Sequence, residues 1–333
     1  MSKRSLRVVA VVLGAILLCA LAVLLIGPFL LPIAPLDDLA SADQVAGDAS
    51  QFVTIPYPGI DGLDIHYMEE MSDENGPTFV LLHGSLFNAY TWSDVIDFFG
   101  QHGRVIAYDQ IPYGLSEKPV AGEWAEDNPY TSQAAIDQLF AFLDALNVDE
   151  AILVGNSYGG VLAAQAALVE PEMVEGLVLV DAAVYVQEEM PAWLMNLPQV
   201  RRLGLLFARR LGQSEAFIRQ TYRDPELISD ERIALTMANT QVENWDTALW
   251  EYLRAWDTDS IDLTDRIDQI RQPTLVISGD SDAIAPLADS QRLHSELPNA
   301  ELTVLTACGH VPQEECPEQF KEAVAVWLSK LAW

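Results

Sequence analysis

A serine stands inside a glycine-flanked motif at residues 155–159, which read Gly-Asn-Ser-Tyr-Gly. The motif follows an apolar run at residues 151–154, and helical spacing of apolar residues begins at residue 158. A sharp turn between a strand and a helix exposes a serine hydroxyl and brings backbone amides beside it. Because a hydroxyl is a weak nucleophile until a base takes its proton, Ser157 needs a base from elsewhere in the chain. The alternative is an ordinary glycine-containing turn.

His310, the last of the five histidines, is the candidate base. It stands in Cys-Gly-His at residues 308–310, just after an apolar run at residues 302–305. A lone histidine in a loop is usually only a polar surface residue. In this chain Ser157 comes first, Asp280 and Asp282 come next, and His310 comes last. Serine, aspartate, histidine is one of the known chain orders of a catalytic triad.

Asp282 is the candidate that orients the histidine. Residues 279–282 read Gly-Asp-Ser-Asp and follow an apolar run at residues 274–277. In this interpretation His310 takes the proton of Ser157, and Asp282 fixes the imidazole tautomer and stabilises its charged form. Asp280 lies nearer the strand end and is the alternative acid. A turn whose aspartates only cap the next helix is the alternative without chemistry.

Two backbone amides are the candidates for an oxyanion hole, which binds the negatively charged oxygen that forms during acyl transfer. His83 and Gly84 follow an apolar run at residues 78–82, so the amide of Ser85 is one candidate donor. The amide of Tyr158, directly after the nucleophile, is the other. We expect the His83 side chain to bind backbone groups at its own turn rather than to take part in chemistry.

An alternation of strands and helices from residue 51 onward must position these residues. Residues 52–55 and 63–67 flank a Pro-Gly turn and predict an opening hairpin. Short apolar runs typical of buried strands follow at residues 78–82, 105–108, 151–154, 177–180, 274–277 and 302–305. Helical spacing lies between them, at residues 92–99, 133–146, 158–169, 287–296 and 317–331. The pattern predicts an α/β fold with a mostly parallel sheet covered by helices on both faces, and Asp109 is expected to shape a turn at a strand end.

Residues 184–260 interrupt the alternation, because they contain no strand-like run and show helical spacing. We predict a helical cap, inserted after the sixth strand, over the carboxyl ends of the strands, where active sites of open α/β sheets lie. The core is then residues 51–183 and 261–333. The large apolar residues of the cap are expected to pack it on the core or to line an acyl or aromatic pocket: Trp193, Leu194, Leu197, Leu205, Leu206, Phe207 and Trp250.

Residues 1–31 predict a basic flank followed by a transmembrane anchor. Residues 8–31 carry no charge, are mostly apolar and exceed the roughly 20 residues that a helix needs to cross a bilayer. The preceding Lys and Arg residues place the N-terminus in the cytoplasm and the rest of the chain on the outer side. A cleavable signal peptide, which would release a secreted protein, and a buried core helix are the alternatives. Residues 32–50 read as a linker.

The whole chain of 333 residues is acidic, with 49 Asp and Glu against 18 Lys and Arg and a net charge of −31. Such a surface repels polyanions, which excludes nucleic acid as a partner. The three cysteines show no zinc-site spacing. We expect Cys308 and Cys316 to be buried thiols, with a bridge between them as the alternative in an oxidising compartment. No phosphate-binding glycine loop of standard spacing is present, and we expect no cofactor and no metal.

Together the motifs resemble the α/β-hydrolase superfamily, in the branch with a helical cap. The resemblance spans about residues 78–320 and rests on residues 83–84, 109–116, 155–160, 279–286 and 309–310. Epoxide hydrolases and dehalogenases of this branch have an aspartate where this chain has Ser157, so the resemblance implies a serine-nucleophile member. The motifs around Ser157 and His310 are also similar to those of carbon–carbon bond hydrolases of aromatic-ring degradation. Those enzymes usually have a glycine-rich stretch where residues 85–88 of this chain read Ser-Leu-Phe-Asn.

The resemblance implies a serine hydrolase that cleaves carboxylic esters through an acyl-enzyme intermediate. We expect a small apolar acyl or aromatic ester as substrate and the lipid bilayer as partner of residues 8–31. One alternative is a carbon–carbon bond hydrolase of the meta-cleavage type. Another is a membrane-tethered binding protein without activity, because a fold does not fix a function.

Overall fold

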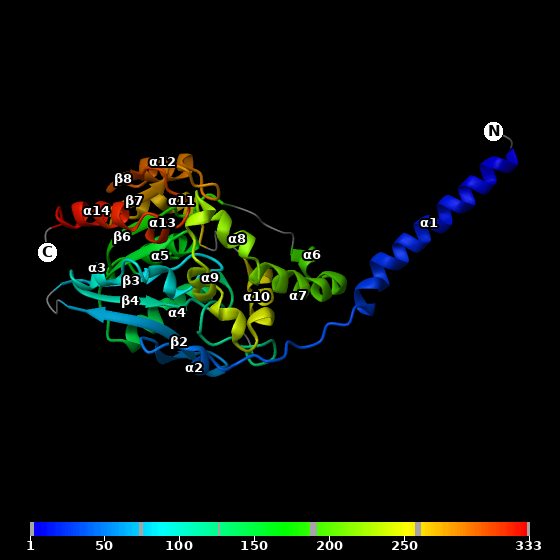
Figure 1. Cartoon of the computed structure of the whole chain (residues 1–333), viewed down its shortest axis with the longest axis horizontal. Coiled ribbons are helices and arrows are strands. Elements are labelled where there is room, and N and C mark those ends of the chain that lie inside the picture. Colours follow the sequence, from blue (N-terminus) through cyan, green and yellow to red (C-terminus); the bar gives the residue numbers. More distant parts are fainter. Residues whose placement is uncertain (1–2, 73–75, 126, 187–191, 257–260, 332–333) are drawn as a thin grey trace.

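The structure is a computed structural model that describes residues 3–72, 76–125, 127–186, 192–256 and 261–331 (Figure 1). Its centre is one eight-stranded sheet with the strand order β1-β2-β4-β3-β5-β6-β7-β8. The strands are β1 (Gln51–Tyr57), β2 (Ile60–Met71), β3 (Thr78–Leu82), β4 (Arg104–Tyr108), β5 (Ala151–Asn156), β6 (Val174–Val180), β7 (Thr274–Gly279) and β8 (Ala300–Leu305). The opening hairpin β1–β2 and the pair β2–β4 are antiparallel, and every later pair is parallel. The predicted mostly parallel sheet is confirmed.

Helices cover both faces of the sheet because successive side chains of a strand point to opposite sides. In β3, Val80 and Leu82 pack in the cluster that contains residues of α4 and α5, whereas Phe79 and Leu81 pack with α3 and α14. The covering elements are α3 (Ile96–Gly100), α4 (Ser132–Ala145), α5 (Tyr158–Val169), α11 (Leu263–Arg266), α12 (Leu287–Glu296), α13 (Pro312–Glu315) and α14 (Pro317–Leu328). The helix expected at residues 92–99 is divided into a 3-10 turn, η1 (Ala89–Trp92), and α3.

Within residues 192–256, between β6 and β7, the chain forms five helices that we call the cap. They are α6 (Ala192–Met195), α7 (Pro198–Gly212), α8 (Glu215–Gln220), α9 (Asp230–Thr236) and α10 (Trp245–Ala255), with short 3-10 turns η2 (Pro225–Leu227) and η3 (Ala238–Gln241) between them; η4 (Ile267–Gln269) follows α11. Their place after the sixth strand agrees with the predicted fold. Residues 187–191 and 257–260, near the predicted cap boundaries, lie outside the described residues.

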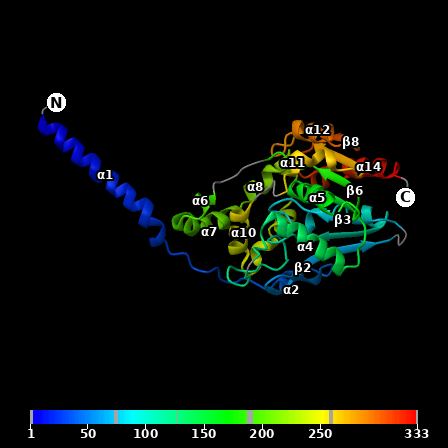
Figure 2. The ribbon, with the colours of Figure 1, turned by 180° about the vertical axis from the view of Figure 1, so that it is seen from behind.

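Helix α1 (Lys3–Leu30) projects away from the body at the end where α6 and α7 lie (Figures 1 and 2). Its stretch Ser5–Leu30 is long and apolar enough to cross a membrane. None of the residues in its most apolar 18-residue part is buried in the structure. A signal sequence near an N-terminus shares this length and composition.

The expected linker, residues 32–50, does more than connect α1 to the sheet. It contains a short helix, α2 (Ala42–Val45), and Ala40 pairs with the cap. The amide of Ala40 donates to the carbonyl of Gln241 at 2.8 Å, and the amide of Glu243 donates to the carbonyl of Ala40 at 3.0 Å. The second half of the linker is therefore attached to the body at the cap.

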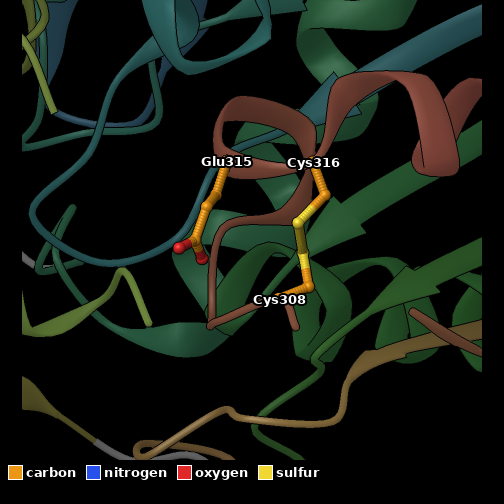
Figure 3. A group of neighbouring side chains, drawn as sticks. All are labelled: Cys308, Glu315 and Cys316. Carbon is orange, nitrogen blue, oxygen red and sulfur yellow. A yellow bond between two sulfur atoms is a disulfide. The ribbon is translucent and has the colours of Figure 1, made fainter. Parts of the chain in front are cut away.

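Cys308 and Cys316 form a disulfide, so the expectation of two free thiols is wrong (Figure 3). The chain turns back through α13 before α14 begins, which brings the two Cα atoms within 6.1 Å of each other. That separation falls in the usual range for a bridge. Cys19 is the free cysteine of the described residues and lies exposed on α1.

Candidate active site

Ser157 occupies the turn between β5 and α5 with a left-handed backbone, φ 54° and ψ −117°. A residue other than glycine adopts such a conformation only when its surroundings impose it. Here the amide of Ser157 donates to Val180 at 3.0 Å, and its carbonyl accepts from Gly160 and Ala183 at 3.1 and 3.2 Å. These bonds to β6 and its following loop hold the serine at the carboxyl end of the sheet.

The side chain of His310 faces the predicted acid. Its Nδ1 lies 2.7 Å from Asp282 Oδ2, and both side chains are almost completely buried. The other oxygen, Asp282 Oδ1, accepts the amides of Ile284 and Ala285 at 2.7 and 3.1 Å. Those two bonds fix the carboxylate and aim its free oxygen at the imidazole.

Asp280, the alternative acid, lies elsewhere in this loop. Its carboxylate is exposed and accepts the Ser281 hydroxyl at 2.7 Å and the Cys308 amide at 3.4 Å. Hydrogen bonds from Ser281 and from neighbouring backbone amides lower the pKa of Asp280. Asp280 therefore holds the loop, and Asp282 is the aspartate that reaches His310.

Asp181, which the sequence analysis did not single out, adds a second buried carboxyl group beside Asp282. It follows β6 directly and accepts the Ser278 hydroxyl at 2.9 Å and the Gly279 amide at 3.1 Å. Burial, and then the negative charge of Asp282, raise the pKa of Asp181 well above its usual range. Burial and a neighbouring negative charge both raise the free energy of the ionised form of a carboxyl group. The raised pKa therefore favours the neutral form of Asp181 in the folded protein.

The backbone of His310 is tied to two further parts of the chain. Asn156, the last residue of β5, donates from Nδ2 to the His310 carbonyl at 2.9 Å and to the Val180 carbonyl at 3.1 Å. The His310 amide donates to the carbonyl of Thr221, in the cap, at 2.7 Å. Asn156 precedes the nucleophile, and this position in the motif is the signal by which its role could have been suspected.

One cavity of about 140 Å³ brings the predicted residues together. Its lining includes Ser157, His310, Ser85 and Tyr158, so the nucleophile, the base and both proposed amide donors share one space. Gly84 lies so near the nucleophile that a Cβ there would be 2.9 Å from Ser157 Cβ. The His-Gly loop after β3 and the turn after β5 are therefore in contact.

The rest of the cavity wall is apolar and comes partly from the cap. Phe217, Trp256 and Val186 line it together with Phe87, Val161, Ala183, Ile284 and Thr221. The Trp256 ring packs on the ring of Tyr158, with centroids 5.4 Å apart. None of the seven apolar cap residues named from the sequence lines it; Trp250 and Leu205 pack in the core cluster, the other role expected for this set. A wider hollow of about 760 Å³ lies near Thr78, at the amino-terminal ends of the strands, and holds none of the predicted site residues.

His83 is structural, as expected. Its Nδ1 lies 2.8 Å from the Gly84 carbonyl, and its Nε2 accepts the Gln110 amide at 3.0 Å. This pattern requires a neutral ring, and burial lowers the pKa of His83 accordingly. His83 thus fixes the loop that presents the Ser85 amide.

Asp109 shapes its turn as expected. Its carboxylate accepts the amides of Ala89 and Leu115, each at 2.6 Å, and lies 2.6 Å from His66 Nδ1. Burial alone would raise the pKa of Asp109, but the charge and hydrogen bond of His66 and further contacts lower it to about 2. Its partner His66, on β2, was not identified from the sequence.

Cys308, Glu315 and Cys316 are close enough to resemble a metal-binding group among the described residues (Figure 3). Both sulfurs are consumed in the disulfide, so they are not thiolate ligands. Glu315 instead accepts the amides of Gly309, Asp224 and Arg223 at 2.6, 3.0 and 3.1 Å. The group connects the His310 loop to the cap.

The model of the family described as alpha/beta hydrolase fold matches residues 77–317. The chain belongs to the α/β-hydrolase superfamily. As an α/β hydrolase it carries the serine turn after β5, the acid after β7 and the histidine after β8 in the superfamily's order.

Known α/β hydrolases are similar over most of their length. The uncharacterized hydrolase YugF of Bacillus subtilis is 29% identical over 274 residues, which cover 81% of this chain and 96% of the relative. A 2-hydroxymuconate semialdehyde hydrolase of Pseudomonas putida is 32% identical over 243 residues, covering 69% of this chain and 78% of the relative. The crystal structure of a hydrolase from Pseudomonas aeruginosa superposes with a TM-score of 0.66 at 22% identity, covering 85% of this chain and 99% of that one. At that identity the structural likeness shows the fold alone.

Proposed function

We propose that this α/β hydrolase cleaves carboxylic esters through an acyl-enzyme intermediate on Ser157. The supporting observation is the 2.7 Å contact between His310 Nδ1 and Asp282, together with the cavity that Ser157 and His310 both line. In this proposal Asp282 holds the proton of His310 on Nδ1. The other nitrogen, Nε2, is then free of a proton and serves as the base.

The proposed reaction has two similar halves. His310 Nε2 accepts the hydroxyl proton while Ser157 Oγ attacks the carbonyl carbon of the ester. The amides of Ser85 and Tyr158 stabilise the resulting oxyanion. His310 then gives its proton to the alcohol oxygen as the carbon–oxygen bond breaks, which leaves the acyl group on Ser157. Water, activated by His310, attacks the acyl-enzyme and releases the acid.

The cavity favours a small neutral substrate. Among the described residues, its lining contains no Arg, Lys, Asp or Glu. A charged substrate group would therefore lack an ionic partner there. The volume of about 140 Å³ is also below the roughly 300–1,000 Å³ of pockets for drug-sized ligands. We infer a preference for short apolar acyl groups or small aromatic esters.

Carbon–carbon bond hydrolysis is the second candidate, because a 2-hydroxymuconate semialdehyde hydrolase is 32% identical to this chain. That relative's named substrate is derived from muconate and bears a carboxylate. The lack of a basic residue in the described lining speaks for esters instead. A binding protein without activity is the third candidate, and the complete serine, histidine and aspartate set speaks against it.

We propose further that α1 is an uncleaved anchor, with the catalytic part on the outer side of the membrane. The support is the length of the span and its apolar surface, which would otherwise face water. An alkaline carbonate wash of membranes should leave the full-length chain in the pellet. Recovery of a soluble chain that lacks α1 would instead indicate a signal peptide.

The experiment for the ester proposal compares p-nitrophenyl esters from acetate to decanoate with a meta-cleavage substrate. Full-length enzyme and Ser157→Ala are assayed in the same detergent. We expect hydrolysis of the short esters, a decline toward decanoate, and a loss of about 10⁶-fold in kcat without the serine. Turnover of the meta-cleavage substrate alone would support the second candidate. A folded enzyme that turns over neither would support a binding role.

A further inference from the structure

Helices α6 and α7 of the cap expose large apolar side chains. Trp193 is 69% exposed and Phe207 is 58% exposed, while Leu197 and Leu203 are 38% and 39% exposed. Leu203 and Phe207 are one helical turn apart on α7, so they lie on the same face of the helix. An apolar stripe of this size on a water-soluble body usually marks a contact surface.

The same segment is basic in a chain that is otherwise acidic. Residues 192–214 contain four arginines and no Asp or Glu, although the whole chain has 49 acidic against 18 basic residues. Arg201 and Arg210 are exposed, and no ion-pair partner is seen for either within the described ranges. Arg210 lies two turns after Leu203, on the face that carries Phe207. This combination of apolar and basic residues on one helix is typical of helices that lie in a membrane interface.

Contacts with α1 fix where this surface lies. Gln199 donates to the carbonyl of Leu25 at 3.3 Å, and Arg202 donates to the carbonyl of Leu31 at 2.9 Å. Arg209 reaches the carbonyl of Ala34 at 2.9 Å. Figures 1 and 2 both show α7 as the part of the body that meets the end of α1.

If α1 spans the bilayer, its last turns lie at the outer edge of the hydrocarbon layer. The helix that contacts those turns must then lie at the same depth. We propose that the α6–α7 surface, defined by Trp193, Leu197, Leu203, Phe207 and Arg210, docks on the outer leaflet of the bilayer and prefers anionic headgroups. This inference rests on the proposed anchor and is independent of the ester proposal.

Docking on lipid explains the charge pattern better than contact with a second copy. A second copy would present mostly acidic surface to a stripe whose centre is apolar. A bilayer offers apolar chains to Trp193 and Phe207, and anionic headgroups to Arg210. The docked cap would hold the cavity close to the membrane surface, because α8 and Trp256 of the cap segment border it.

The test measures depth in the membrane and does not use activity. The full-length chain carries Cys19→Ser and Phe207→Cys, labelled with the fluorophore NBD, and is reconstituted in vesicles of equal parts phosphatidylcholine and phosphatidylglycerol. The disulfide leaves no other thiol in the described residues. Quenching by lipids brominated near the headgroup reports contact with the interface. The control is Val326→Cys on α14, at the opposite end of the body, where the side chain is 52% exposed.

We expect a blue-shifted emission at position 207 and quenching several-fold stronger than at position 326. Replacing Arg210 by Gln should weaken the quenching in phosphatidylglycerol vesicles toward the value in pure phosphatidylcholine. A melting temperature equal to that of the wild type establishes that each variant keeps the fold.

A probe on the native Cys19 separates the two proposals. At Cys19 the quenchers are lipids brominated near the ends of the acyl chains, because this position lies in the middle of the apolar helix. Quenching at Cys19 by these lipids, with no quenching at position 207, would overturn the docking and leave the anchor. No quenching at Cys19 would overturn the anchor, and the docking with it. If the emission at position 207 is blue-shifted but brominated lipid does not quench it, another protein surface covers this apolar stripe. That result would also overturn the docking on lipid.

Discussion

His310 is held from three separate parts of the chain. Asp282 lies against its Nδ1, Asn156 binds its carbonyl, and Thr221 of the cap accepts its amide. The two backbone bonds fix the main chain of His310, and the imidazole cannot rotate without breaking its contact with Asp282. Such fixed geometry is what proton transfer between a serine and an imidazole requires.

Replacing Asp282 by Asn should lower kcat by about 10⁴-fold, because the imidazole would lose the tautomer that accepts a proton on Nε2. Asp280→Asn is the matched control. Asp280 is exposed, does not contact the His310 side chain, and reaches the His310 loop only through a long 3.4 Å bond from the Cys308 amide. This variant should therefore keep a rate close to that of the wild type. Ester hydrolysis at neutral pH measures both. A large loss in Asp280→Asn with little loss in Asp282→Asn would reverse the assignment.

Asp181→Asn should change how stability depends on pH. Burial and the charge of Asp282 raise the pKa of Asp181 in the folded state above its unfolded value of about 3.9. Its contribution to stability is therefore complete below that unfolded value and is lost as the pH rises through the folded pKa. An Asn side chain cannot ionise. The free energy of unfolding of the variant should therefore increase relative to that of the wild type as the pH rises. Urea unfolding at a series of pH values checks this; a pH-independent difference would contradict it.

The sequence predicts those site residues that stand in a local motif, and it does not predict those placed by contacts between distant segments. Ser157, Asp282 and His310 were predictable because each stands in a short motif directly after an apolar run. Asp181 follows such a run as well, but its pairing with Asp282 depends on β6 and β7 being neighbours in the sheet. Asn156 could have been suspected only from its position before Ser157, because its side chain binds carbonyls of Val180 and His310 that are far away in sequence. The contact of the Thr221 carbonyl with the His310 amide also joins distant segments, and no local pattern contains it.

Among the elements, the loop between β8 and α14 is closed by the Cys308–Cys316 disulfide, and His310 lies inside the closed ring. Replacing both cysteines by Ala should lower the free energy of unfolding by about 2–3 kcal/mol, because the ring restricts the unfolded chain. We also expect a lower kcat, because His310 is then less firmly placed. Chemical denaturation and ester hydrolysis measure the two effects. Cys19→Ser, on α1, is the control; equal stability of the double variant and this control would contradict the prediction.

Helices α7 and α10 approach closely at Gly204. A Cβ at this position would lie 2.1 Å from Cζ2 of the buried Trp250. Gly204→Ala should therefore cost about 1–3 kcal/mol of stability by forcing the two helices apart. Gly47→Ala, where a Cβ meets nothing within 4 Å, is the control and should stay within about 0.5 kcal/mol. Denaturation followed by tryptophan fluorescence compares them, and equal midpoints would show that α7 and α10 can separate freely.

The strands and long helices of the core were predictable because buried parallel strands read as continuous apolar runs. Helices α5 and α12 begin and end at the predicted residues. The cap was harder, because every face of its helices carries some apolar residues. Trp250 packs inside the body, Trp193 and Phe207 are exposed, and the cavity takes Phe217 and Trp256 instead. Only the packing of α7 on α10 and α1 decides which apolar side chain faces which surface.

At the scale of the whole molecule, the chain combines an apolar helix, a basic cap surface and an acidic body. The net charge of −31 belongs mostly to the body, whereas α6 and α7 carry arginines and no acidic residue. The composition predicted the acidic surface and the apolar helix. The position of α7 beside the end of α1 could not be predicted, because it depends on the linker that attaches to the cap at Ala40.

The central claim is that Ser157 is a nucleophile activated by His310. A fluorophosphonate reacts with an activated serine and adds a mass that peptide mapping can locate. Full-length wild type, Ser157→Ala and His310→Ala are treated alike, with a heat-denatured wild type as control. We predict one modified peptide, residues 155–160 within it, in the native wild type and no label in the other three samples. A native wild type that stays unlabelled, or a label on another serine that persists in Ser157→Ala, would contradict the account.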